Sequence, residues 1–120
     1  MAIPPEEITA QRLAGALLRL RQIHSDMTIQ QAAALLFIAG NPGITQRRVW
    51  ALLDISDGVA SRTLAILGEY GSRGTQPLGL IEVRADLNDR RNRICRLTPK
   101  GERLIGQIHA DLYGAKGGDA

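Results

Sequence analysis

Apolar residues recur at helical spacing in two short runs between Thr45 and Leu67, and the two runs meet at Ile55-Ser56. Each run predicts a short helix with one face directed into a core. The inward positions are Val49, Leu52 and Leu53 on the first helix and Ala60, Leu64 and Leu67 on the second. Two short helices separated by so tight a turn are typical of a helix-turn-helix.

The start of the second helix carries small and polar side chains. Ser56 is a suitable N-cap, and the turns that follow expose Asp57, Ser61 and Arg62 on the side away from the apolar stripe. A helix with such a face can enter a groove of DNA. We therefore treat this second helix as a candidate recognition helix.

Two further apolar patterns precede the motif. Residues 6–23 predict a helix with acidic residues first and basic residues last, whose apolar stripe must cover either this subunit's core or a second subunit. Thr28 and Gln31 form a capping-box pair that opens another helix, which ends at Gly40. That helix is apolar on every side from residue 32 to residue 39, so we expect it to be the buried axis of the domain.

Alternating apolar positions predict a β-hairpin after the recognition helix. The alternating positions are Leu80, Ile81 and Val83 in the first strand and Arg93, Cys95 and Leu97 in the second. Residues 86–92 form the polar connection, which gives the hairpin a basic tip. Glycines and a proline make residues 68–79 a loop, and Ile44 adds a short extended residue after the turn Asn41-Pro42-Gly43.

Thr98 can cap a last helix that has Pro99 at its first position. Its apolar face consists of Leu104, Ile105, Ile108 and Leu112. The pattern as a whole predicts a mainly α fold with a small β-hairpin, a winged helix-turn-helix. We expect one domain over residues 1–120, with flanking helices at 6–23 and 99–113 and a disordered tail at 114–120.

Composition narrows the possible partners. The chain has 15 basic and 12 acidic residues, and 13 of the basic residues are arginines, whose planar forks suit phosphates and base edges. Five arginines lie in the segment from Arg84 to Arg96. This clustering indicates an anionic partner more clearly than the net charge of +3 does. One cysteine, no signal-peptide pattern and no apolar run near 20 residues predict an intracellular, cytoplasmic protein without a membrane span.

Other candidate chemistry has simpler explanations. Cys95 alternates on a strand and is better explained as a core residue than as a redox sensor. His24 and His109 have no ligand partners at metal spacing, and Trp50 is a packing residue. The glycine-rich segment 68–79 does not match a phosphate-binding loop, and no nucleophile has a base at recognisable spacing. We expect no enzyme activity, cofactor or metal, and we assign no effector pocket.

Several spaced motifs between Thr28 and Leu112 resemble those of MarR-type transcriptional regulators. They are Thr45-Gln46, Ile55-Ser56, Ser61-Arg62, Gly79-Leu80-Ile81, Asp86-Leu87-Asn88-Asp89-Arg90-Arg91 and Leu97-Thr98-Pro99-Lys100-Gly101. The resemblance implies a homodimer that places two recognition helices in successive major grooves and each wing at a flanking minor groove. In the family's wing motif an aspartate holds an arginine, and these positions match Asp89 and Arg91.

The chain departs from the family pattern in four respects. The segment 68–77 is longer than the corresponding segment of most family members. Trp50 stands where the family commonly has a small residue, and Arg48 stands where it commonly has an acidic residue. The flanking helices are also short for the family. These departures bear on the loop after the recognition helix and on the dimer.

The sequence thus predicts a double-stranded DNA-binding regulator that acts as a homodimer on a pseudo-palindromic operator. Thr45, Gln46 and Arg47 would contact phosphates, Asp57, Ser61 and Arg62 would read bases, and Arg90, Arg91 and Arg93 would serve the wing. Asp57 has a simpler alternative, which is to neutralise the helix N-terminus. Dimerisation would use Leu13, Leu17, Leu20, Ile23, Ile105, Ile108 and Leu112.

Two simpler interpretations remain open for these basic residues. Arg47 and its neighbour Arg48 could form an ordinary solvated surface. The hairpin arginines could serve solely to protect a sheet edge from aggregation.

An alternative function also remains open for the protein as a whole. Winged-helix architecture alone does not prove DNA binding. The protein could instead be a protein-interaction or assembly module that binds an acidic partner through its basic wing.

Overall fold

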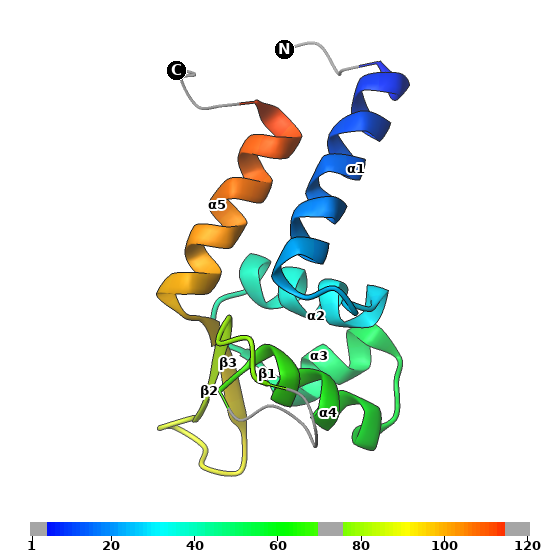
Figure 1. Cartoon of the computed structure of the whole chain (residues 1–120). Coiled ribbons are helices and arrows are strands. Elements are labelled where there is room, and N and C mark those ends of the chain that lie inside the picture. The colour runs from blue at the N-terminus through cyan, green and yellow to red at the C-terminus, as the bar shows by residue number, and fades with distance from the viewer. Residues whose placement is uncertain (1–4, 70–75, 115–120) are drawn as a thin grey trace. The chain divides into compact units, whose positions relative to one another are not determined.

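The computed structural model describes residues 5–69 and 76–114, and the chain divides into two compact units. The terminal-helix unit contains α1 (Glu6–Ile23) and the part of α5 (Pro99–Tyr113) from Arg103 onward. The winged unit spans Thr28–Glu102 (Figure 1). Its elements are α2 (Ile29–Gly40), β1 (Ile44–Thr45), α3 (Gln46–Leu53), α4 (Asp57–Leu67), β2 (Ile81–Ala85) and β3 (Arg93–Leu97).

Side-chain hydrogen bonds join the two helices of the terminal-helix unit. The Arg19 guanidinium donates to both carboxylate oxygens of Asp111, at 2.6 and 2.9 Å. Arg12 donates to the carbonyl oxygen of Leu112 at 3.0 Å. The hydrogen bond from Arg19 holds the pKa of Asp111 below its usual range and raises the pKa of Arg19. The bounds predicted for α1 from sequence are confirmed.

Helix α2 supplies much of the core of the winged unit. Its N-terminus carries the predicted capping box, in which Thr28 and Gln31 exchange side-chain and backbone hydrogen bonds of 3.0 Å. Ala34, Leu35 and Ile38 are fully buried. The expectation that the helix would be buried all round is wrong, because Leu36 is 44% exposed. The sheet and the other helices of the unit do not cover every side of α2.

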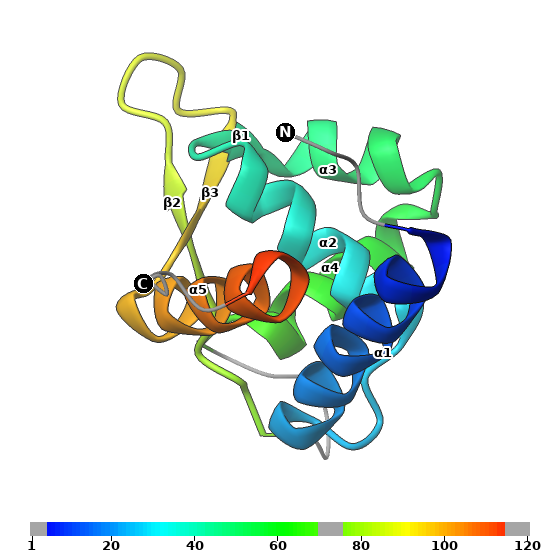
Figure 2. The same cartoon turned by 90° about the horizontal axis from the view of Figure 1, so that it is seen from above.

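The predicted hairpin is confirmed and belongs to a three-stranded antiparallel sheet with the order β1-β3-β2. Cys95 on β3 pairs with Val83 on β2 and with Ile44 on β1. The extended residue expected at Ile44 is therefore an edge strand. In Figure 2 the connection between β2 and β3 extends beyond the helices of the winged unit.

The link between α4 and the hairpin is fixed at both ends. Backbone N–H groups of Leu78 and Leu80 donate to the carbonyl oxygens of Ile66 and Leu67, each at 2.8 Å. Gly101 in the first turn of α5 lies so close to this segment that a Cβ there would collide with the Leu80 carbonyl oxygen. Only glycine fits this approach. The central part of the predicted loop, and the predicted tail from residue 115 onward, lie outside the described residues.

The apolar face predicted for α3 is partly wrong. Val49 is fully buried, but Leu52 is 37% exposed, although it was expected to point inward. Leu52 lies with Phe37 and Ile44 on the wall of a shallow hollow between α2 and α3. A helix of eight residues has too few turns to bury a wide stripe, so only the side nearest the sheet and α2 is covered.

Candidate nucleic-acid interface

Helices α3 and α4 form the predicted helix-turn-helix, and a hydroxyl caps each N-terminus. Thr45 Oγ1 accepts a hydrogen bond from the N–H of Arg48 at 3.1 Å, and Ser56 Oγ accepts one from the N–H of Val59 at 3.4 Å. Asp54 ends α3 in the left-handed conformation, with φ of 54°. The left-handed residue changes the direction of the chain between α3 and α4, and the short connection predicted from the sequence is therefore a tight turn.

Helix α4 separates its apolar and polar residues. Ala60, Leu64 and Leu67 are buried, as predicted. The three predicted base-reading residues, Asp57, Ser61 and Arg62, are exposed. Their side chains are therefore free to meet the edges of base pairs, whose hydrogen-bonding groups side chains of these types can recognise.

The predicted phosphate-contacting residues lie at the start of α3. Arg47 is exposed, whereas Thr45 and Gln46 are half-buried. The hydroxyl of Thr45 accepts the capping hydrogen bond and still has its own hydrogen to donate. A hydroxyl, an amide and a guanidinium at one helix start form a set of donors suited to phosphate oxygens.

Asp89 organises the tip of the wing. Its carboxylate accepts hydrogen bonds from the backbone N–H of Arg91 at 3.1 Å and from Arg91 Nε at 3.2 Å. Asn92 also donates its side-chain amide to Asp89, at 3.5 Å. The Arg91 side chain is nevertheless 90% exposed. The tip thus holds a solvated guanidinium in a fixed direction, the pairing that the family's wing motif implies.

The other wing residues flank this arginine. Arg90 is exposed next to it, and Leu87 is 93% exposed on the same tip. Arg93 begins β3 opposite Ala85. In Figure 1 the tip of the wing and α4 lie toward the same end of the winged unit. Two elements from separate parts of the sequence, α4 and the wing tip, therefore lie toward one end of this unit.

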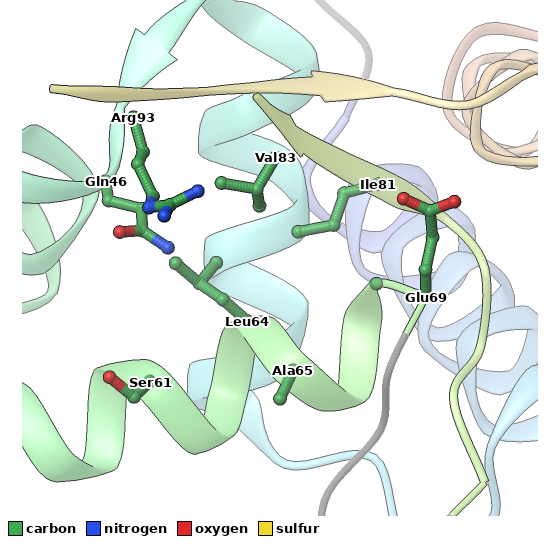
Figure 3. A pocket seen from close by; sticks show the side chains of 9 residues that line it. Gln46, Ser61, Leu64, Ala65, Glu69, Ile81, Val83 and Arg93 are labelled. Atoms are coloured by element: carbon green, nitrogen blue, oxygen red, sulfur yellow. The ribbon is translucent and has the colours of Figure 1, made fainter. Parts of the chain in front are cut away.

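Between α4 and the hairpin lies an open pocket of about 270 Å³. Gln46 and Arg93 enter it close together, and Ser61 and Glu69 lie farther along its wall (Figure 3). Leu64, Ile81 and Val83 form its apolar floor. No pocket was expected from the sequence. No local signal could have indicated one, because its wall comes from three segments that only the tertiary fold brings together.

Cys95 has the environment of a core residue. Its side chain is fully buried, and burial raises the pKa of its thiol to about 11. A neutral, inaccessible thiol is a poor nucleophile, as the sequence interpretation expected. Within residues 5–69 and 76–114, no three His, Cys, Asp or Glu residues are grouped to hold a metal ion. In the same part of the chain, no helix has the length and apolar character of a membrane span.

The residues proposed for dimerisation fall into two groups. Leu20 and Ile108 are already buried in the single chain, and Ile23, Ile105 and Leu112 are half-buried. Leu13 and Leu17 are 50% and 54% exposed on α1. Only this second group presents a large apolar surface to a partner.

No protein-family model and no curated protein matches the chain. Solved structures do match. MarR shares 29% sequence identity over 91% of this chain and 75% of its own, with a TM-score of 0.61. A MarR family transcription regulator shares 30% identity over 88% of this chain and 60% of its own, with a TM-score of 0.60. The S. aureus MepR–DNA complex shares 22% identity over 88% of this chain and 78% of its own, with a TM-score of 0.67.

The fold and the arrangement of its polar residues define a winged helix-turn-helix protein. Its fold is similar to that of MarR and of a MarR family transcription regulator, the family that the spaced motifs of the sequence resemble.

Proposed function

We propose that this protein is a transcription regulator that binds double-stranded DNA sequence-specifically, as a homodimer on a pseudo-palindromic operator. One observation carries the proposal. Helix α4, with its exposed polar residues, and the wing tip, which carries the Asp89-held Arg91, belong to the same unit and lie toward the same end of it. A helix fits the major groove, and an arginine is attracted to the narrow minor groove next to it.

The proposed contacts divide by role. Thr45, Gln46 and Arg47 contact phosphates and set the position of the unit on the duplex. Ser61 and Arg62 read base edges. Asp57 accepts a hydrogen bond from a cytosine amino group or offsets the positive end of the α4 dipole. Arg90, Arg91 and Arg93 serve the minor groove and its phosphates.

The comparisons support this proposal at the level of a DNA-binding regulator. The matched protein with 30% identity is described as a transcription regulator, and MepR was solved in complex with DNA. This chain carries the corresponding fold together with exposed basic and polar residues on α3, α4 and the wing.

The homodimer rests on the exposed apolar surface of α1. Leu13 and Leu17 each leave about half of the side chain in contact with water. A second copy that covers them removes this surface, and two-fold symmetry then makes the operator pseudo-palindromic. The family resemblance implies the same oligomeric state.

Selection of bound duplexes from a random pool tests the proposal. We expect an enriched motif with two inverted half-sites about one helical turn apart. The control is Arg62→Ala/Arg91→Ala, in which both altered side chains are exposed. It should keep the helical circular dichroism of the wild type and lose the enrichment. If no sequence is enriched and duplex DNA is not retained at moderate salt, the proposal fails, and the interaction-module alternative is favoured.

A further inference from the structure

A second, smaller pocket of the winged unit lies between the start of α3 and the base of the wing. Its volume is about 150 Å³, and Thr45 and Trp50 form part of its wall. Three arginines also line it: Arg47 from α3, and Arg91 and Arg93 from the wing. Two elements far apart in the sequence thus both contribute arginines to the lining of one small hollow.

The charge of this pocket is not balanced by protein carboxylates. No acidic residue lines it in the part of the chain that the structure describes. Arg91 is paired with Asp89, but among the described residues Arg47 and Arg93 have no carboxylate within salt-bridge distance. Cations gathered around a concave surface raise the local potential and attract an anion.

Trp50 makes the pocket unusual. Its indole Nε1 is buried and has no hydrogen-bond partner among the described residues. A buried donor without an acceptor is destabilising, so native structures seldom retain one unless a water, an ion or a ligand satisfies it. Trp50 contributes a wall to the pocket, and an anionic ligand fits the excess of arginines around it.

We infer that this pocket holds one backbone phosphate of bound DNA, and that Arg47 and Arg93 grip that phosphate jointly. The inference rests on the proposed function and adds to it a contact shared by two elements. Guanidinium forks bind phosphate oxygens in pairs, and two forks from different elements can hold different oxygens of one phosphate. The helix-turn-helix and the wing are then fixed to the same point of the DNA backbone.

Salt dependence of duplex binding tests the shared contact. The logarithm of the binding constant falls with the logarithm of salt concentration by about 0.9 for each neutralised phosphate. We expect Arg47→Gln and Arg93→Gln each to reduce the slope by less than about one unit, and the double variant by no more than about one. The matched control is Arg84→Gln, since Arg84 is already paired with Glu82 at 3.3 Å and with Glu69 at 3.6 Å. Its slope should equal that of the wild type.

Two results of this experiment would overturn the inference. A double variant whose slope falls by about two units would mean that the arginines bind separate phosphates. A double variant with an unchanged slope would mean that neither arginine contacts a phosphate. In both cases duplex binding itself persists, so the proposed function stands.

Fluorescence tests the pocket without DNA, because Trp50 is the single tryptophan of the chain. Titration with inorganic phosphate at constant ionic strength should change the emission saturably in the wild type and in Arg84→Gln. The change should disappear in Arg47→Gln and in Arg93→Gln. An emission change that is absent, or equal in all four proteins, would contradict a phosphate site here. A saturable change in a protein that binds no duplex at any salt would reject the DNA phosphate as ligand and the proposed function together, in favour of a free phosphate or a phosphorylated small molecule.

Discussion

The winged unit and the terminal-helix unit differ in how completely their apolar stripes are buried. In the winged unit, Val49, Leu64 and Leu67 are buried, and the exposed side chains on α4 and the wing are mostly polar. In the terminal-helix unit, the stripe on α1 buries Leu20 but leaves Leu17 54% exposed. The first unit covers most of the apolar positions that the sequence predicts to be inward, with Leu52 as an exception, whereas the second leaves much of its α1 stripe exposed to water.

This difference indicates different roles for the two units, DNA contact for the winged unit and association for the terminal-helix unit. A unit with its apolar groups covered can present charged residues in fixed directions, as Asp89 does for Arg91. A helix that keeps leucines in water carries a free-energy penalty that association with another chain removes. We therefore expect substitutions in the two units to be distinguishable by their dependence on protein concentration.

The largest effect is expected from a cavity in the winged unit. Leu67 is fully buried, so Leu67→Ala should lower the free energy of unfolding by about 2–5 kcal/mol. Urea denaturation at two protein concentrations measures this loss. The loss should be the same at both concentrations. A loss that vanishes at high protein concentration would contradict the view that the core of the winged unit is complete within one chain.

Leu17→Glu tests the exposed part of the α1 stripe. Burial of a leucine stabilises by roughly 1.5–3 kcal/mol, and a two-fold interface contains the residue twice, so the dimer should dissociate. Sedimentation at micromolar concentration measures this, and operator affinity should fall with it. Gln22→Glu adds the same charge at an exposed polar position of α1 and should leave the dimer intact. Leu20 is less suitable, because a charge at this buried position would also damage the single chain.

Arg62→Ala tests base reading by the winged unit. Loss of a bidentate contact to a base should weaken binding to the preferred operator by about 1–3 kcal/mol and relax the preference at one position per half-site. Competition between operator variants and random duplex measures both quantities. An equal loss on operator and random DNA would make Arg62 a phosphate contact instead.

Arg91→Ala should weaken binding to all sequences while leaving the fold intact, since its side chain is solvated. If Arg91 contacts a phosphate, the salt slope should fall by about one unit. Leu87→Ala is the matched control, because Leu87 is an exposed and uncharged residue of the same tip. Its slope should not change. Unchanged affinity and slope for Arg91→Ala would refute the wing assignment.

The smallest effect concerns pH in the terminal-helix unit. The hydrogen bond from Arg19 lowers the pKa of Asp111. A carboxylate with a lowered pKa stabilises the folded state above its unfolded-state pKa, and this contribution is lost as the pH falls through the folded-state pKa. Between about pH 5 and about pH 3 the wild type should therefore lose more stability than Asp111→Asn. Parallel thermal melts over this range measure the difference. Equal pH dependence in the two proteins would mean that the ion pair does not contribute.

Much of the fold could be predicted because its determinants are local. Capping residues such as Thr28 and Ser56 lie within one turn of the N–H groups that they satisfy, so their spacing alone identifies the helix starts. The wing motif is equally local, since Asp89 bonds to a residue two positions away. The DNA-contacting roles of the exposed residues stay predictions.

Sequence by itself thus determined the helices, the hairpin, their caps and the stripes that must be covered. Only the tertiary structure decided how far each stripe is covered, because helical periodicity identifies an apolar face but not its neighbours. It buried Leu20, left Leu17 and Leu52 exposed, and made Ile44 an edge strand beside β3. It also brought Arg47 and Arg93 around one pocket, because a contact between residues so far apart in the chain exists only after the sheet has paired and α3 has packed against it.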